Sequence, residues 1–560
     1  MAISLLKKIL PSWKNMLLAI LASALLILAF PDFEIWFFAW FALVPLMCAV
    51  ERETKLQKPE LQKPARSKGV SHAIDSSIIR SFVLGWIFGT TFFFGTCWWL
   101  TYAPINYAAF PPILAYFLLF CVTTVAGLFP GIFAAILSMH VRRFGSRAFL
   151  AAPFVWVFTE FLRYLITGNN WNAIGYSQAF TKQTVHFSEF GGVLLVGFPL
   201  ALFASLVTKW VAKPQRYWLP AVFFLLFWLT SDFSVGPLLG MNSDPPFINR
   251  SPIVAKIVAV QANVPMSGLD QSKWQRLRDA QTRFAEEKVY DYRHPVPTPR
   301  PDGRSHIDFP EPPETPVVVI LPESPMNFLY SDDREFQQFI GDFARENNVS
   351  VLFNSSEPDK GTTKYFNSAV MVGPDGKQVD QYDKIYLLPF GEAVPSFLEG
   401  IVPGFVGNFA YGREYDLFPV GDAKAGVMIC FESHFGALSR EYVRNGADVI
   451  IEMTNDGYLG PTPVLRQHLA NAVFRAVETN RPVLRVTNVG ITAYIDEKGR
   501  VLDAATPYQE ETRVWSVSKS DGSQTFYVKY GDWFAWLCSM ITIGILLLTL
   551  LIKRPKFLKI

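Results

Sequence analysis

VMICFESHFG, residues 427–436, joins an apolar run to a cysteine and then to polar residues. The apolar residues before Cys430 are typical of a buried strand, so Cys430 stands where that strand ends. The chain has five cysteines, and the other four lie in long apolar runs: Cys48, Cys97, Cys121 and Cys538. Cys430 therefore has no partner in the soluble part of the chain. A disulfide there is excluded unless it joins two molecules.

Half of the 560 residues are apolar, and the longest apolar runs lie in the first 240 residues and near the C-terminus. Roughly 18 apolar residues are needed to cross a bilayer as a helix. Eight runs approach or exceed this length: 15–31, 34–50, 81–104, 110–139, 149–166, 187–208, 217–232 and 531–552. We therefore expect a polytopic α-helical membrane domain with eight transmembrane helices.

Basic residues indicate the orientation of these spans, because cytoplasmic loops carry an excess of lysine and arginine. They gather in alternate segments: Lys7, Lys8 and Lys14, the loop 51–80, Arg142, Arg143 and Arg147, Lys209, Lys213 and Arg216, and the tail from Lys553. The first run has no small-residue cleavage site after it and is expected to remain as a helix. The region between the seventh and eighth spans then lies outside the cytoplasm. A net charge of +3 is too small to indicate nucleic-acid binding.

The expected domains are a membrane domain at 1–240 with seven spans, an extracytoplasmic domain at 250–520, and a last span with a cytoplasmic tail at 528–560. In the second domain, β-rich runs alternate with helix candidates at 270–290, 332–346, 434–445 and 463–480, which predicts an α/β fold. Residues 293–316 carry eight prolines, and we interpret them as a solvated surface insertion.

Three residues whose side chains can act in catalysis stand at the ends of predicted strands: Glu323 in VVVILPESP, Lys384 in QYDKIYLLPFGE and Cys430. A thiol is mostly protonated at neutral pH, so a nucleophilic cysteine needs a base, which a carboxylate supplies. A lysine, together with the backbone N–H after the nucleophile, stabilises an oxyanion. Taken singly, each residue also has an ordinary interpretation: Cys430 as a small buried hydrophobe, and the other two as surface charges.

In the order Glu, Lys, Cys, these segments resemble the nitrilase (carbon–nitrogen hydrolase) superfamily. With the eight spans, the whole chain resembles the bacterial apolipoprotein N-acyltransferase family. The motifs that carry this resemblance are YDKIYLLPFGEAVP, VMICFES, TNDGYLG, AVFRAVETNRPVLRVTNVGITA and AAPFVWVFTEFLRY. The resemblance implies a four-layer αββα sandwich in which Cys430 is the nucleophile, Glu323 the base and Lys384 the residue that stabilises the oxyanion.

By the same resemblance, Glu392 and Glu432 are carboxylates of the site, while Asn455, Asp456 and Arg485 hold its loops. Alternation along a strand also places Glu432 on the same face as Cys430. The family often has tyrosine after the nucleophile, where this chain has Phe431, and tryptophan where it has Tyr458. Trp274 matches a family tryptophan near the acyl site. A catalytic pair of Cys430 with His434 is an alternative to the pair of Cys430 with Glu323. A histidine at this position is, however, more typical of a helix surface.

The activity implied is that of an acyltransferase. An acyl chain moves from the sn-1 position of a phospholipid to Cys430 as a thioester, and then to the α-amino group of the S-diacylglyceryl cysteine of an apolipoprotein. The expected partners are the phospholipid, the apolipoprotein and the bilayer; no cofactor or metal is implied. The resemblance further implies a monomer in the bacterial inner membrane, with its catalytic domain on the periplasmic side.

Two other functions stay open on the sequence. A membrane-tethered nitrilase-like amidase needs the same three residues, with water as the second nucleophile, and a non-catalytic envelope scaffold needs none of them. The segment 400–418 separates the two enzymes, because its aromatic residues Phe405, Phe409, Tyr411 and Phe418 suit an apolar entrance. Its glycines suit a mobile flap that dips into the membrane.

Overall fold

The computed structural model describes residues 9–56, 76–212, 252–294, 298–299, 305–306, 315–323, 328–389, 391–393 and 409–551. The chain divides into two compact units. The helical unit comprises Met1–Pro245, Thr462–Gln467 and Tyr530–Ile560, and the α/β unit comprises Pro246–Pro461 and His468–Lys529.

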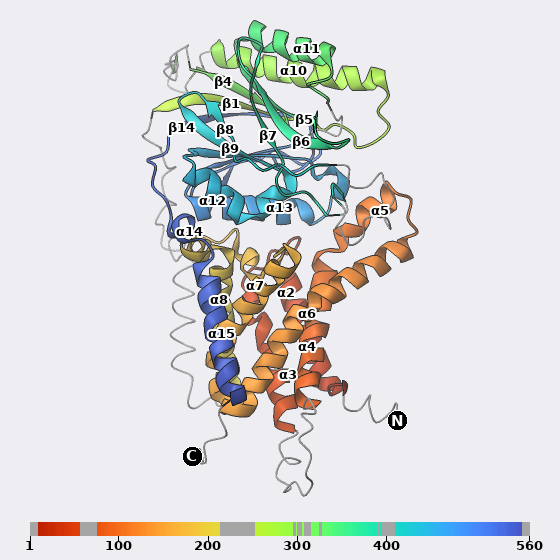
Figure 1. Ribbon diagram of the computed structural model, residues 1–560, viewed down its shortest axis with the longest axis vertical. Coiled ribbons are helices and arrows are strands. Elements are labelled where there is room, and N and C mark those ends of the chain that lie inside the picture. Colours follow the sequence, from red (N-terminus) through yellow and green to blue (C-terminus); the bar gives the residue numbers. More distant parts are fainter. Residues whose placement is uncertain are drawn as a thin grey trace, which may run out of the picture. The chain divides into compact units, whose positions relative to one another are not determined.

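Long helices make up the described part of the helical unit (Figure 1). They are α2 (Trp13–Ala29), α3 (Phe38–Leu56), α4 (Ser76–Thr96), α6 (Pro112–Phe144), α7 (Ala152–Thr167), α8 (Ser188–Ala212) and α15 (Trp533–Leu551), with the short α5 (Tyr102–Asn106). Among the described residues, four helical stretches are long and apolar enough to cross a membrane: 76–96, 112–150, 184–212 and 533–551. The protein is therefore a membrane protein. The predicted number of eight spans is not confirmed, because the expected span at 217–232 lies outside the described residues.

A buried carboxylate joins the ends of three of these helices. Glu53, near the end of α3, accepts hydrogen bonds from the backbone N–H of Ser12 at 2.7 Å and from Asn15 Nδ2 at 2.9 Å. Arg80, near the start of α4, lies 3.7 Å from the other oxygen of Glu53. The beginnings of α2 and α4 and the end of α3 thus meet at one end of the unit. The basic residues next to these helix ends are brought together there.

Helices α4 and α6 approach so closely that only glycine fits between them. A Cβ atom on Gly85 would lie 2.1 Å from the carbonyl oxygen of Pro130, and one on Gly89 would lie 2.8 Å from the Cα of Gly127. Close backbone contact of this kind is the usual way in which membrane helices pack.

Gly85→Ala is therefore expected to destabilise the protein by about 1–3 kcal/mol or more, because backbone atoms must move to admit the methyl group. The matched control is Gly544→Ala, in α15, where a Cβ would meet no atom within 4 Å. Thermal unfolding in detergent measures the difference between the two variants. Equal melting temperatures would show that α4 and α6 are not packed as described.

The α/β unit contains two six-stranded sheets. The first has the order β14-β1-β4-β5-β6-β7 and the second has the order β13-β12-β11-β10-β9-β8. The strands of the first sheet are β1 (Ile253–Gln261), β4 (Val317–Ile320), β5 (Ser350–Pro358), β6 (Tyr365–Val372), β7 (Gln378–Asp383) and β14 (Glu511–Ser518). Those of the second are β8 (Leu417–Val420), β9 (Ala423–Ile429), β10 (Val449–Thr454), β11 (Val483–Thr487), β12 (Ala493–Ile495) and β13 (Val501–Leu502).

Helices cover the outer face of each sheet, so the unit has four layers (Figure 1). On the first sheet lie α10 (Gln271–Arg293) and α11 (Arg334–Glu346), and on the second lie α12 (Gly436–Arg444) and α13 (Val464–Thr479), with the short α14 (Phe526–Tyr530) following. In the middle of each sheet the strands are parallel: β1 with β4 and β5, and β9 with β10 and β11. The expected α/β fold with an αββα layer order is therefore observed.

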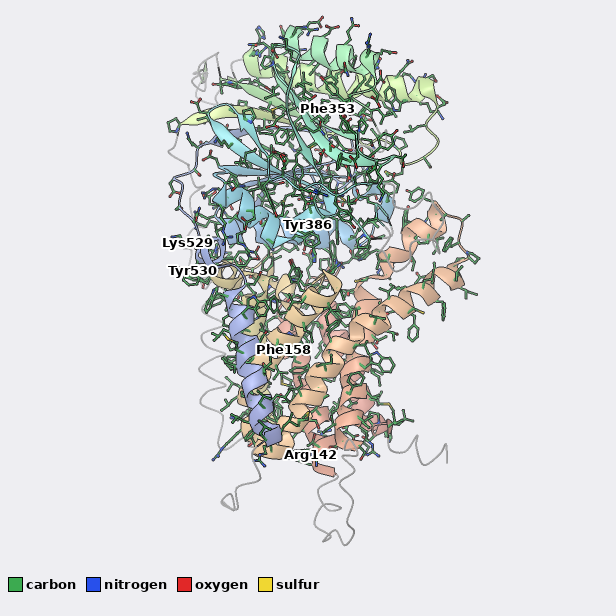
Figure 2. The ribbon with its side chains drawn as sticks, viewed as in Figure 1. Arg142, Phe158, Phe353, Tyr386, Lys529 and Tyr530 are labelled. Atoms are coloured by element: carbon green, nitrogen blue, oxygen red, sulfur yellow. The ribbon has the colours of Figure 1, made fainter. Side chains whose placement is uncertain are left out.

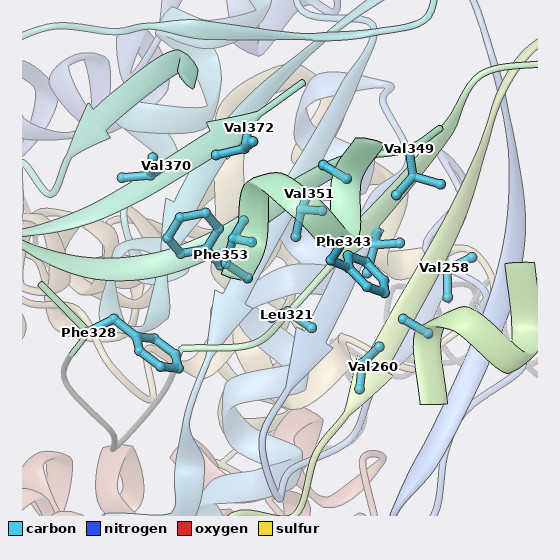
Figure 3. Packing of buried hydrophobic residues seen from close by; sticks show 14 of the residues in the cluster. Val258, Val260, Leu321, Phe328, Phe343, Val349, Val351, Phe353, Val370 and Val372 are labelled. Carbon is cyan, nitrogen blue, oxygen red and sulfur yellow. The ribbon is translucent and has the colours of Figure 1, made fainter. Parts of the chain in front are cut away.

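One apolar core lies between the first sheet and its helices (Figure 3). Strand residues such as Val351 and Phe353 pack there against Phe336 and Phe343 of α11. Alternate residues of the strands point toward this layer, and the apolar stripe of α11 faces them. Burying one such side chain contributes about 1.5–3 kcal/mol, so this layer holds the sheet rigid beneath the loops that follow its strands.

The four helices predicted for the α/β unit are confirmed, but several predictions for the surrounding segments are wrong or untested. Phe418 is fully buried in β8, which pairs with β9, so it does not line an entrance. The strands β8 and β14 had not been predicted. The Pro-rich segment 293–316 was interpreted as an insertion without strands. It contains two short strands, β2 (Thr298–Pro299) and β3 (Ser305–His306), which pair with each other. Phe405 and the rest of 400–408, the first part of the proposed flap, lie outside the described residues.

Candidate active site

The three predicted catalytic residues follow three different strands. Glu323 lies three positions after β4, while Lys384 and Cys430 come directly after β7 and β9. The first two strands belong to one sheet and β9 belongs to the other. The two sheets face each other, so the loops after these strands meet at one edge of the sandwich. The structure thus brings together the three residues that the sequence singled out.

Cys430 ends its strand in an unusual backbone conformation. Its φ is +53°, in the left-handed region that residues with a side chain rarely occupy, and it opens a 3₁₀ helix, η8 (Cys430–His434). Such a conformation costs about 1–3 kcal/mol and is found where function requires it. The prediction that Glu432 shares a strand face with Cys430 is therefore wrong in its reason, because the strand has already ended.

Glu323 is held by donors on both oxygens. Asn367 Nδ2 donates to Oε1 at 3.1 Å, and the backbone N–H of Asn455 donates to Oε2 at 3.1 Å. The carboxyl group also interacts directly with the Cys430 thiol, and 14% of the side chain is exposed. Burial raises the pKa of Glu323, while the nearby positive charge of Lys384 opposes that rise. A carboxylate with a raised pKa beside a thiol is suited to accept its proton.

Lys384 lies between two carboxylates and is 1% exposed. Its Nζ is 2.8 Å from Glu392 Oε1 and 3.9 Å from Glu323 Oε1. Burial alone lowers the pKa of Lys384, but Glu392 and Glu323 outweigh it and raise the pKa above its ordinary value. Lys384 therefore stays positively charged throughout the physiological range and provides a fixed charge for a developing oxyanion.

The thiol of Cys430 is protonated before reaction. Burial, and next the negative charge of Glu323, raise its pKa well above the ordinary value, although Lys384 opposes them. A thiol in this state is a poor nucleophile unless its proton leaves as the new bond forms. Glu323 is placed to receive that proton, so the three residues together support nucleophilic acyl transfer.

Glu392 belongs to the same cluster, as predicted. Besides its contact with Lys384, its Oε1 accepts from Asn367 Nδ2 at 2.7 Å and its Oε2 accepts from the N–H of Leu388 at 2.8 Å. Asn367, on β6, thereby joins Glu392 to Glu323, and Asn354 Nδ2 donates to its amide oxygen at 2.7 Å. Sequence reasoning missed Asn367. Its position near the start of a strand otherwise rich in apolar residues was the available signal.

Glu432 holds the segments next to Lys384 and Cys430 together through hydrogen bonds. It is completely buried and accepts hydrogen bonds from four donors: Tyr382 OH at 2.8 Å and the N–H groups of Ile385 at 2.7 Å, Tyr386 at 3.0 Å and Ile429 at 2.9 Å. Two of these donors follow Lys384 and one precedes Cys430. Glu432 thus fixes the segment that carries the lysine against the segment that carries the cysteine.

Aromatic side chains lie beside the nucleophile. The ring of Phe431 is half-buried, 5.3 Å from that of Phe435, and Phe435 stacks on Tyr386 at 4.1 Å. Tyr386 is labelled in Figure 2. His434 is only 2% exposed and lies 5.7 Å from the ring of Phe431. The expectation of a surface histidine at this position is therefore wrong.

Trp274, which was predicted to lie near the acyl site, packs against the segment between β4 and α11. In the first turn of α10 its ring packs at 5.2 Å on Phe328, and the guanidinium of Arg278 lies 5.6 Å from it. With Phe328 it lines an open cleft of about 510 Å³ whose other described lining residues are Leu329, Asp332, Asp333 and Arg334. None of these lining residues is a catalytic candidate. That Trp274 lies near the acyl site therefore stays a prediction.

Comparison with known proteins agrees with both units. Residues 310–525 match the family model "Carbon-nitrogen hydrolase", and residues 69–206 match "Apolipoprotein N-acyltransferase N-terminal domain". The chain is 29% identical to an apolipoprotein N-acyltransferase of Geobacter metallireducens, covering 94% of this chain and 93% of that one. It is 26% identical to one of Pasteurella multocida, covering 96% of each. A relative from Thermotoga maritima is 34% identical, over 40% of this chain and 43% of its own.

Proposed function

Because the chain belongs to the apolipoprotein N-acyltransferase family of carbon–nitrogen hydrolases, we propose that it acylates the amino terminus of lipoproteins through a thioester on Cys430. One observation carries this mechanism: the carboxyl group of Glu323 interacts with the Cys430 thiol, and its Oε1 lies 3.9 Å from Lys384 Nζ. A base, a nucleophile and a fixed positive charge are thus within reach of one reacting carbonyl.

In the first half-reaction, the sulfur of Cys430 attacks the carbonyl carbon of a phospholipid ester while Glu323 takes the thiol proton. The oxyanion that forms lies near Lys384. When the intermediate collapses, the ester C–O bond breaks and Glu323 returns the proton to the leaving glycerol oxygen. The products are the thioester and a lysophospholipid. The sn-1 ester is the proposed donor position.

In the second half-reaction, the α-amino group of the diacylglyceryl cysteine attacks the thioester carbonyl. Glu323 takes a proton from that nitrogen, the C–S bond breaks, and the proton passes to the departing sulfur. An amide is formed and the free thiol of Cys430 is restored. The same carboxylate serves both halves, which fits a site whose base is hydrogen-bonded on both oxygens but still partly exposed.

Attachment to a membrane follows from the substrates. Removing one long acyl chain from a bilayer costs about 10 kcal/mol at about 0.8 kcal/mol per CH₂, so the site must work at the membrane surface. We propose the bacterial inner membrane, with the α/β unit on the periplasmic side and eight spans, of which 217–232 is the seventh. Support comes from the basic residues beside the joined ends of α2, α3 and α4, which the positive-inside rule places in the cytoplasm.

A monomer is the proposed active form, since Glu323, Lys384, Glu392 and Cys430 all come from one chain and contact one another within it. The assembled residues also argue against a non-catalytic scaffold, which has no need to bury a lysine between two carboxylates next to a thiol.

The test is intact-mass analysis of the purified protein after incubation with phospholipid. The expected result is one acyl adduct that maps to Cys430 and disappears when a diacylglyceryl peptide with a free α-amino group is added, with acylated peptide as product. If water removes the adduct as fast as the peptide does, the protein is a hydrolase of the amidase type. If no adduct forms, the thioester mechanism is wrong.

A further inference from the structure

A histidine that the mechanism does not yet use lies directly beneath Cys430. His468, on α13, is 3% exposed. Its Nδ1 lies 2.7 Å from Asp456 Oδ1, and its Nε2 lies 3.1 Å from the carbonyl oxygen of Cys430 and 3.0 Å from Ser433 Oγ. Glu452 Oε1 is 3.2 Å from the same Nε2. The ring thus joins the loop after β10 to the nucleophile.

The surroundings of the ring set its protonation. A carboxylate faces Nδ1, and a carbonyl oxygen with a second carboxylate faces Nε2, so hydrogen bonds on both sides require protons on both nitrogens. Arg485 completes the cluster, with NH2 2.8 Å from Asp456 Oδ2 and NH1 2.5 Å from Glu452 Oε1. Two carboxylates then face two cations, so the buried cluster is neutral as a whole.

The carbonyl of Cys430 is part of a rigid unit that matters for catalysis. Within one planar trans peptide the C=O and the next N–H point in opposite directions. Holding the carbonyl of Cys430 toward His468 therefore points the N–H of Phe431 the other way. That N–H follows the nucleophile, where a donor to the oxyanion is needed. The same hydrogen bond restrains the left-handed backbone of Cys430, whose φ is +53°.

We propose that His468 is a positioning residue: as an imidazolium it holds the carbonyl of Cys430, and thereby fixes both the left-handed turn that presents the thiol and the direction of the Phe431 N–H toward the oxyanion. This inference rests on the proposed function, because it takes Cys430 as the nucleophile.

Electrostatics agree with the geometry. Burial and Arg485 lower the pKa of His468, but Asp456 and Glu452 outweigh them and raise it to about 9. The ring is then charged at neutral pH and loses its second proton as the pH rises through about 9. Lys384 does not titrate in that range, since its own pKa is raised above the ordinary value. Deprotonation of Cys430 would increase the rate, whereas loss of the imidazolium decreases it.

The experiment compares His468→Gln with a matched control, Asn471→Leu. Asn471 is also buried on α13, and its Nδ2 has no hydrogen-bond partner among the described residues. The rate of acyl-adduct formation on Cys430 is followed by intact mass between pH 6 and about 10.5, with melting temperatures alongside. Glutamine cannot donate in both directions, so we expect adduct formation to slow by about 10²-fold, as when a reacting group is misplaced. The control is expected to react at the wild-type rate.

The pH profile separates positioning from a merely structural role. In the wild type, the rate is expected to fall as pH rises through about 9, and His468→Gln is expected to lack that fall. A normal rate in His468→Gln, or a fall that persists, overturns the proposal. If the variant unfolds, ¹⁵N spectra of histidine-labelled wild type at pH 7.5 give the protonation state of His468 directly. Two protonated ring nitrogens support the proposal, and a neutral ring overturns it. Absence of any adduct in the wild type instead overturns the thioester mechanism, and this inference with it.

Discussion

Cys430→Ala is expected to abolish the acyl adduct and to lower N-acylation by a factor on the order of 10⁴ or more, as when a nucleophile is removed from other hydrolases. The substitution removes only the sulfur atom. Alanine meets the same left-handed backbone as cysteine, so the strain at φ +53° is unchanged. The side chain is half-buried, and the melting temperature should therefore change little.

Cys430→Ser is expected to fail as well, for a different reason. Its hydroxyl is a much weaker acid than a thiol, and Glu323 must already accept a proton from a thiol whose pKa is raised. The natural control is Cys121→Ala, which changes an exposed cysteine of α6 in the helical unit. Activity is measured with phospholipid and a diacylglyceryl peptide. Normal turnover by Cys430→Ala would remove the thioester mechanism altogether, whereas loss of activity in Cys121→Ala would point to damage unrelated to chemistry.

The positions of two catalytic candidates, Glu323 and Cys430, were predictable because each follows an apolar strand. Buried parallel strands are near-continuous apolar runs, so the polar residue that ends each run marks the edge of a sheet. Lys384 does not meet this description, because it follows β7, an antiparallel edge strand of largely polar sequence, and it was predicted from its motif instead. That β4 and β7 lie in one sheet and β9 in the other was not readable in the same way, since pairing between distant strands leaves no periodic signal. The family resemblance supplied only the αββα layer order.

What the sequence did not reveal depends on backbone geometry. A left-handed residue is expected at glycine or asparagine, and Cys430 gives no such signal, so Glu432 was placed on a strand face. In the structure Glu432 instead accepts four hydrogen bonds beneath the loops. Phe418 was misread for a related reason: β8 is only four residues long and contains a proline, and its burial comes from pairing with β9.

The buried charge cluster was only partly predicted: the resemblance named Asp456 and Arg485, but neither Glu452 nor His468. Glu452, Asp456, His468 and Arg485 come from two strands, a 3₁₀ turn and a helix, with no regular spacing along the chain. Each would be expected at a surface if taken singly. They are stable inside because every carboxylate meets a cation, an arrangement that only the folded sheet creates.

Lys384→Met is expected to slow thioester formation by about 10²–10³-fold, the usual cost of losing one group that stabilises an oxyanion. Methionine has a similar length and apolar stem, but it leaves Glu323 and Glu392 facing each other through Asn367 without a cation. Burial already raises the pKa of Glu323, and Lys384 is what limits that rise. Without the lysine, Glu323 should hold its proton to a higher pH and be a base less often.

The pH dependence therefore tests this interpretation more sharply than the rate alone. Thioester formation needs Glu323 deprotonated, so the wild-type rate rises with pH through the pKa of Glu323. In Lys384→Met that rise should move to higher pH, because the stabilising charge is gone. Lys384→Arg should restore little, since a planar guanidinium does not fit a site where Nζ lies 2.8 Å from one carboxylate and 3.9 Å from another.

Lys364→Met is the matched control, since it removes an exposed lysine of the same unit. Rates are measured as adduct formation on Cys430, with melting temperatures to exclude unfolding. A slow Lys384→Met variant whose rate rises over the same pH range as the wild type would mean that Lys384 acts only on the oxyanion. A Lys384→Met variant with the wild-type rate would mean that Lys384 neither stabilises the oxyanion nor lowers the pKa of Glu323. Both effects are assigned to the one positive charge of Lys384, so removing that charge must change at least one of them.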